Sequence, residues 1–153
     1  MFELFDHTAD LGLRVKGATL EELLAEAGRG LLTMLVANPD AVRAGQSRTI
    51  ELSATEPSYL LFDWLSELLY AFESEKLLLA QFKIELRRRE GEAPAEPLSG
   101  SDSVWSLSAT CRGESMDPTR HTMDHEVKAI TYHGLTVRQN YDGTWEAEVI
   151  VDI

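Results

Sequence analysis

Two segments of this chain repeat their apolar residues at the spacing of an α-helix, whereas most of its other apolar residues alternate as in β-strands. One helical segment follows Thr19 and the other begins at Pro57. An apolar stripe along a helix has to pack against another layer of structure. The two periods together therefore predict a mixed α+β domain.

The ends of both predicted helices are marked by local signals. Thr19 and Glu22 have the spacing of a capping box, and Asn38-Pro39 ends this first helix. Its apolar stripe consists of Leu20, Leu23, Leu24, Ala27, Leu31, Met34 and Leu35. Pro57 suits the first turn of the second helix. The stripe of that helix consists of Leu60, Leu61, Trp64, Leu65, Leu68, Leu69 and Phe72.

Alternating patterns predict about six strands, most of them late in the chain. The predicted strands cover residues 11–16, 48–54, 77–86, 105–112, 127–137 and 145–151. Residues 127–133 are apolar on both faces apart from Lys128, which is typical of a central strand. Asp142-Gly143 predicts a hairpin turn. We therefore expect a two-layer α+β sandwich, with both helices on one face of a largely antiparallel sheet.

The length of 153 residues suits a single domain over residues 1–153. Residues 90–103 are rich in Gly, Pro, Ala, Ser and acidic residues. They predict a long, mobile hairpin loop rather than a domain boundary.

Charge and composition restrict the classes of partner. A net charge of −12 repels phosphates, so strong direct binding to nucleic acid is not expected and a protein partner or a metal fits better. Arg87, Arg88 and Arg89 are a local exception that we interpret as a solvated strand end. The single cysteine, Cys111, excludes an internal disulfide and predicts a small buried residue. No signal peptide or membrane span is expected, which points to the cytoplasm.

Acidic residues gather at both ends of the sequence. Asp6, His7 and Asp10 stand in a predicted connection before the strand 11–16, where caps and Asx turns are an alternative to a cation site. Asp152 ends the last strand beside the α-carboxylate of Ile153. The alternation in that strand places Asp152 off the main core face, free to meet a neighbouring loop.

Two aspartates and a terminal carboxylate are hard oxygen donors, which favour calcium, magnesium or manganese. Zinc is an alternative if His7 joins Asp10 and Asp152. Lys128 shares a predicted face with Ile130, so we expect its stem to be buried and its ammonium to pair with one of the aspartates. The alternative is a lysine that reaches water.

Five segments in order along the whole chain resemble the archease family. They are residues 5–12 (FDHTADLG), 19–23 (TLEEL), 61–70 (LFDWLSELLY), 126–135 (EVKAITYHGL) and 149–153 (VIVDI). The resemblance implies a non-catalytic activator of an RtcB-type RNA-splicing ligase in tRNA splicing and RNA repair. Such proteins promote guanylylation of the ligase and its multiple turnover.

The resemblance also implies a metal site, typically of calcium, formed by Asp10, Asp152 and the carboxylate of Ile153. Lys128 would act electrostatically beside the metal, and Asp6 and His7 are further candidates from the acidic segment near the start of the chain. Adding residues after Ile153 is then expected to weaken the site while the strand survives. Two alternatives stay open, namely a stand-alone metal-dependent phosphoesterase with His7 as general base, and a chaperone-like partner of RNA-modifying enzymes.

Overall fold

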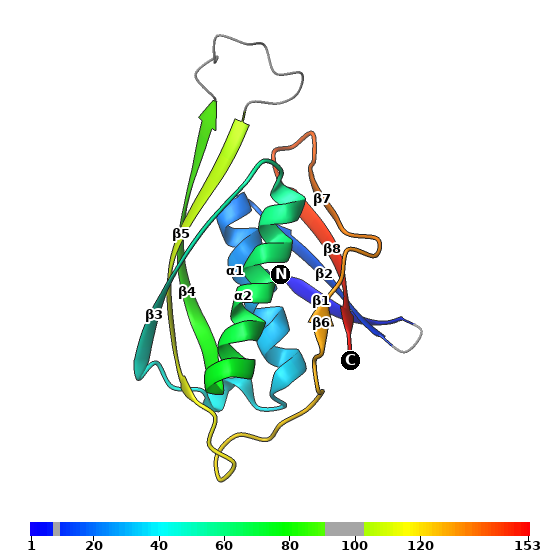
Figure 1. The fold of residues 1–153 in the computed structure, drawn as a ribbon. Helices are drawn as coiled ribbons and strands as arrows, with labels where there is room; N and C mark the ends of the chain where they lie inside the picture. Colours follow the sequence, from blue (N-terminus) through cyan, green and yellow to red (C-terminus); the bar gives the residue numbers. More distant parts are fainter. Residues whose placement is uncertain (8–9, 91–102) are drawn as a thin grey trace.

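The computed structural model describes residues 1–7, 10–90 and 103–153 (Figure 1). Along the chain the elements are β1 (Phe2–His7), β2 (Asp10–Gly17), α1 (Leu20–Leu35), the 3-10 turn η1 (Pro39–Ala41), β3 (Gln46–Ala54), α2 (Pro57–Glu75), β4 (Leu77–Glu90), β5 (Ser103–Ser115), β6 (Ala129–Ile130), β7 (Thr136–Gln139) and β8 (Trp145–Asp152). The loop predicted to be mobile falls mainly on residues 91–102, which lie outside the described residues.

The strands form two antiparallel sheets beside the two helices. The larger sheet has the order β1-β2-β8-β6, with β7 also paired to β8, and the smaller has the order β3-β5-β4. Figure 1 shows α1 and α2 with the smaller sheet on one side and the larger sheet on the other. Helix α1 contacts both β2 and β4, and α2 contacts both β3 and β6. The α+β sandwich is confirmed, but the described residues form eight strands in two sheets rather than about six in one.

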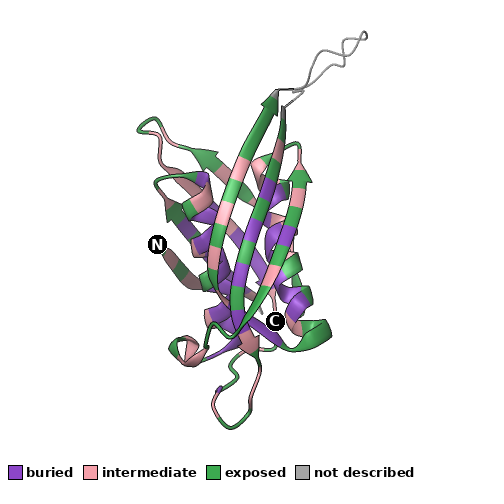
Figure 2. Ribbon diagram, turned by 90° about the vertical axis from the view of Figure 1, so that its left-hand side faces the viewer, coloured by how far each residue is buried: buried purple, intermediate pink, exposed green. Residues whose placement is uncertain are grey.

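The core lies where the helices meet the inner faces of the sheets. Leu13 and Val15 of β2 are fully buried, as are Leu23 and Leu24 of α1. The indole N–H of Trp64 on α2 donates to the carbonyl of Leu24 at 2.8 Å, which joins the two helices inside the core. More buried and more exposed residues alternate along β3, along β5 and along β4 after its first three residues (Figure 2), as the period-two pattern predicts. In the described part of the chain, neither helix is long and apolar enough to cross a membrane.

The first helix begins as the capping signal predicts. The hydroxyl of Thr19 accepts a hydrogen bond from the amide of Glu22 at 3.1 Å. The Glu22 carboxylate reaches back to the amide of Ala18, one residue before the N-cap. The first bond satisfies an amide that the first helical turn leaves without a partner, and the second ties the residue before the N-cap to the helix.

The predicted central strand over residues 127–133 is wrong. Only Ala129–Ile130 pairs with β8, and both Lys128 and Tyr132 are exposed. The amide and hydroxyl of Thr131 both donate to the carbonyl of Ile150, after which Gly134 turns the chain at a φ of +64°. Two short strands, β6 and β7, therefore share β8 where one long strand was expected. The apolar residues of this segment pack on α2 as well as on the sheet, and this explains the misleading pattern.

Candidate metal centre

The structure brings the two ends of the chain together in the larger sheet. Asp10, the first residue of β2, is the direct register partner of Asp152, the last residue of β8. Directly opposed residues in an antiparallel pair point to the same face, with Cβ atoms ~5 Å apart. Both aspartates are partly exposed. Two carboxylates from opposite termini therefore share one face of the sheet.

That face is the outer one, away from the helices. Leu11 and Val151, the neighbours of the two aspartates, are buried in the core, so the aspartates point the other way. Sequence alternation correctly predicted that Asp152 leaves the main core face.

The other acidic residues of the outer face have basic neighbours. Arg14 lies 3.7 Å from Glu3 and 3.6 Å from Glu148, and Glu146 pairs with Lys16 at 3.6 Å and with Arg138 at 2.8 Å. In the described part of the chain, no such pair with a lysine or arginine forms at Asp152. Two opposed like charges are unfavourable unless a cation compensates them. Asp152 therefore differs from the other acidic residues of this face, and it lies directly opposite a second carboxylate, Asp10.

The remaining predicted site residues do not all lie on the same face of the larger sheet. Asp6 pairs with Leu11, so it points to the opposite face from Asp10. His7 pairs with Asp10 through the backbone. The placement of Asp6 and His7 in a connection is wrong, because both belong to β1, which alternation did not reveal. Ile153 follows Asp152 directly and is partly exposed.

Lys128 reaches the site through its backbone. Its amide donates to the carbonyl of Asp152 at 2.8 Å, while its side chain is exposed. The predicted burial of its stem is wrong, because residue 128 precedes the short strand β6 instead of lying within a central strand. A lysine that reaches water fits this position.

The donor set suits a hard divalent cation. Two carboxylates on adjacent strands can hold calcium, magnesium or manganese and leave positions open for water, phosphate or a partner's ligands. Within the described side chains, no group of three or more histidines, cysteines, aspartates and glutamates converges. The Asp10–Asp152 pair is thus an open pair of carboxylates rather than an enclosed cage.

A second charged cluster, which the sequence did not indicate, surrounds His121. This histidine is 3% exposed, and its Nδ1 accepts from the amide of Asp117 at 2.8 Å. Its Nε2 lies 3.0 Å from Glu114, which also bonds the amide of Arg43 and the guanidinium of Arg120. These contacts hold the pKa of Glu114 down at about 2, with the Arg43 amide as the largest cause. Both ring nitrogens are occupied, so His121 is a structural bridge rather than a general base.

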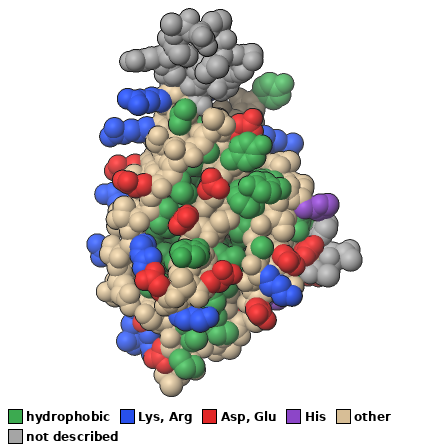
Figure 3. All heavy atoms as spheres, viewed as in Figure 1, with side chains coloured by type: hydrophobic (Ala, Val, Ile, Leu, Met, Phe, Trp, Pro, Cys, Tyr) green, Lys and Arg blue, Asp and Glu red, His purple; other side chains and the backbone are tan. Residues whose placement is uncertain are grey.

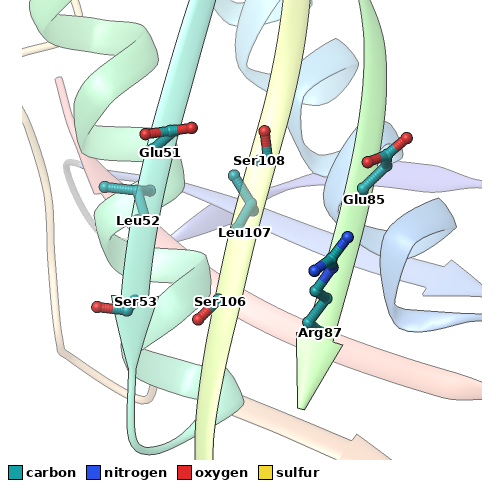
Figure 4. Close-up of a pocket in the computed structure, with 8 residues that line it drawn as sticks. All are labelled: Glu51, Leu52, Ser53, Glu85, Arg87, Ser106, Leu107 and Ser108. Atoms are coloured by element: carbon teal, nitrogen blue, oxygen red, sulfur yellow. The ribbon is translucent and has the colours of Figure 1, made fainter. Parts of the chain in front are cut away.

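An open groove of about 500 Å³ lies on the outer face of the smaller sheet. Figure 4 shows Glu51 and Ser53 on β3, Ser106 and Ser108 on β5, and Glu85 and Arg87 on β4 lining it. None of these residues belongs to the Asp10–Asp152 row, which lies on the other sheet. The groove is a polar sheet face with small residues on its central strand.

Two simpler predictions are confirmed. Cys111 is fully buried on β5 and reduced, and desolvation raises its pKa to about 12. Arg87, Arg88 and Arg89 are exposed near the end of β4, as expected for a solvated strand end.

Comparison with known proteins identifies a matching protein family. Residues 2–153 match the model of the Archease protein family. The chain is 37% identical to an archease of Methanopyrus kandleri over 99% of both chains. It is 33% identical to an archease of Methanosarcina acetivorans over 99% of this chain and 95% of that protein.

Two solved structures are similar over nearly the whole chain. The solution structure of Protein 1598 of Methanobacterium thermoautotrophicum has a TM-score of 0.76 at 30% identity and covers 99% of this chain and 98% of its own. The crystal structure of a Thermotoga maritima archease, described as a possible chaperone, has a TM-score of 0.58 at 21% identity. It covers 100% of this chain and 98% of its own, and this second likeness concerns the fold alone.

Proposed function

The chain belongs to the archease family, and on this premise we propose that it is a metal-binding, non-catalytic activator of an RtcB-type RNA-splicing ligase. The proposed activity is to promote guanylylation of the ligase and its multiple turnover in tRNA splicing and RNA repair. The observation that carries the proposal is the direct pairing of Asp10 with Asp152. It supports a cation site on a surface that a partner protein can reach.

In this proposal Asp10, Asp152 and the carboxylate of Ile153 hold a divalent cation. Calcium is the first choice because it accepts many oxygen ligands in flexible geometry, and magnesium or manganese would fit the same donors. A bound cation would supply positive charge at a transferring phosphoryl group. The residues of this chain would hold the cation on an exposed sheet face and orient it toward the partner.

Lys128, His7 and Asp6 would support the cation site from its surroundings. The amide of Lys128 fixes the backbone of Asp152, and its exposed ammonium can approach a phosphate or a carboxylate of the partner. His7 stands beside Asp10 in the register of the sheet. Asp6, on the opposite face, would act only through the β1–β2 pairing.

The test is a guanylylation assay of an RtcB-type ligase with and without this protein. We expect faster guanylylation and multiple turnover with the wild type, and loss of both with a well-folded Asp10→Ala variant. Glu85→Gln, on the other sheet, is the matched control and should stimulate fully. Full stimulation by Asp10→Ala would rule out the metal-centred mechanism. Phosphate release by the purified protein with manganese, in the absence of ligase, would instead indicate a phosphoesterase.

A further inference from the structure

Three aromatic rings form an exposed cluster at the edge of the larger sheet. Tyr132, which follows β6, stacks on Phe62 of α2 with ring centroids 3.8 Å apart and an interplanar angle of 11°. Tyr59, one turn earlier on α2, meets Tyr132 edge-on at 6.3 Å. We call Tyr59, Phe62 and Tyr132 the aromatic platform.

The platform leaves one face of a tyrosine ring open. Phe62 covers one face of Tyr132, yet 59% of Tyr132 and 48% of Tyr59 remain exposed. Large exposed aromatic rings are frequent anchors of protein interfaces, because they bury much area with little loss of conformational entropy. The packing on Phe62 fixes the ring of Tyr132 before any partner arrives.

Elsewhere the chain places its own cations over partly exposed aromatic rings. The guanidinium of Arg14 lies 4.8 Å from the ring centre of Phe5, and that of Arg88 lies 5.2 Å from the ring of Trp105. Among the described residues, no such contact forms over Tyr132. Its open face is thus a place where a guanidinium from another molecule can stack.

The charges on the α2 side of the platform favour a cation. Helix α2 contains no lysine or arginine, and it carries Asp63, Glu67, Glu73 and Glu75 after the N-cap Glu56. Asp63 lies four residues after Tyr59, so it is adjacent on the helix surface. Figure 3 shows hydrophobic side chains gathered over α2 and the neighbouring sheet edge, with acidic side chains among them.

The platform lies close to the candidate metal centre. Ala129 is the register partner of Asp152, and Tyr132 lies three positions further along the chain. Three residues span at most ~11 Å. Tyr132 points toward α2 and Asp152 toward the outer face, so the edge strand β6 runs between them. A partner protein that binds along this edge would contact both the aromatic platform and the candidate metal centre.

We propose that the aromatic platform docks an arginine side chain on a basic protein surface, with Asp63 as its carboxylate neighbour. Arginine fits better than lysine, because a planar guanidinium can stack on Tyr132 and donate to a carboxylate at once. A stacked nucleic-acid base is disfavoured, because single-strand sites need positive charge along the backbone and α2 has none. The identification of the partner as the RNA ligase rests on the proposed function. The recognition of arginine by the aromatic platform does not depend on that function.

The first experiment uses octa-arginine and octa-lysine peptides, which have equal charge. Fluorescence anisotropy should give the wild type about five-fold tighter binding of octa-arginine than of octa-lysine. Tyr132→Leu keeps an apolar cover on Phe62 but removes the π face, so the preference should disappear. Tyr132→Trp should increase it. Tyr141→Leu, a substitution at a more exposed tyrosine in the β7–β8 turn, should leave it unchanged.

An unchanged arginine preference in folded Tyr132→Leu would overturn the proposal. Binding of single-stranded oligouridine that Tyr132→Leu abolishes would also overturn it, in favour of base stacking. Circular dichroism of each variant checks the fold, and Tyr132→Phe provides a milder substitution that should keep the preference.

The second experiment measures binding of an RtcB-type ligase by calorimetry. Tyr132→Leu should weaken it about five-fold or more, whereas Glu85→Gln, on the smaller sheet, should bind normally. Normal ligase binding by Tyr132→Leu would contradict the assigned partner. If the wild type does not bind the ligase, the proposed function fails, and the peptide comparison still decides whether the platform recognises arginine.

Discussion

Asp10 and Asp152 face each other across the pairing of β2 with β8, so the two ends of the chain jointly place two carboxylates on one exposed sheet face. Opposed carboxylates ~5 Å apart at their Cβ atoms repel, and a divalent cation bound between them would reduce that repulsion. The stability of the sheet should therefore depend on divalent ions.

Calcium is expected to raise the melting temperature of the wild type. At a hundred-fold excess over Kd the stabilisation is about 2.7 kcal/mol, or roughly 5–10 °C for a chain of this size. Asp10→Asn should lose this response, because it removes one of the two carboxylates that would bind the ion. Differential scanning calorimetry with and without calcium provides the measurement. If calcium raised the melting temperature of Asp10→Asn as much as that of the wild type, the ion would bind elsewhere. Glu85→Gln is the control and should respond to calcium like the wild type.

Glu114 should make the protein sensitive to acid. Its folded pKa of about 2 lies below its usual value of 4.5, so its stabilising effect is complete above pH 4.5 and is lost as the pH falls toward 2. Glu114→Gln should lower the free energy of unfolding at pH 7. It should also make the decrease of that free energy below pH 4.5 less steep. Urea unfolding at a series of pH values tests this. Parallel pH curves for the variant and the wild type would contradict it.

Cys111 is expected to be unreactive until the protein unfolds. Burial raises its pKa to about 12 from 9.0, which reduces the thiolate fraction at pH 8 about a thousand-fold. Iodoacetamide should therefore modify the native protein very slowly and the protein in urea rapidly, as mass spectrometry can measure. Rapid modification under native conditions would mean that β5 opens locally.

Gly113 should not tolerate a side chain. A Cβ at this position would lie 1.8 Å from the carbonyl oxygen of Leu78, where β5 pairs with the bulged start of β4. Backbone atoms cannot move aside as a flexible side chain can, so Gly113→Ala should cost about 3 kcal/mol or more. Gly45→Ala, which meets nothing within 4 Å, is the matched control and should change the free energy of unfolding little. Chemical denaturation of both variants provides the comparison.

Local patterns in the sequence were sufficient to predict those helices and strands whose environment is uniform along their length. The stripes of α1 and α2, the capping hydroxyl of Thr19 and the alternation in β8 all report burial on one side, and one-sided burial imposes a regular period. The same reasoning correctly placed Asp152 off the core face and Cys111 inside it. It failed for residues 127–133, because that segment packs partly on α2 and partly on β8 and no single period describes both.

What the sequence determined by itself was the class of fold and the identity of the acidic residues at both termini, because these depend on composition and short-range spacing. Only the tertiary structure decided that Asp10 opposes Asp152, that Asp6 points away, and that Tyr132 stacks on Phe62 beside an acidic helix. These relationships depend on strand order and register across the whole chain. The free energy that selects them comes from burying Leu13, Val149 and their neighbours, so the polar site is positioned by apolar residues that take no part in it.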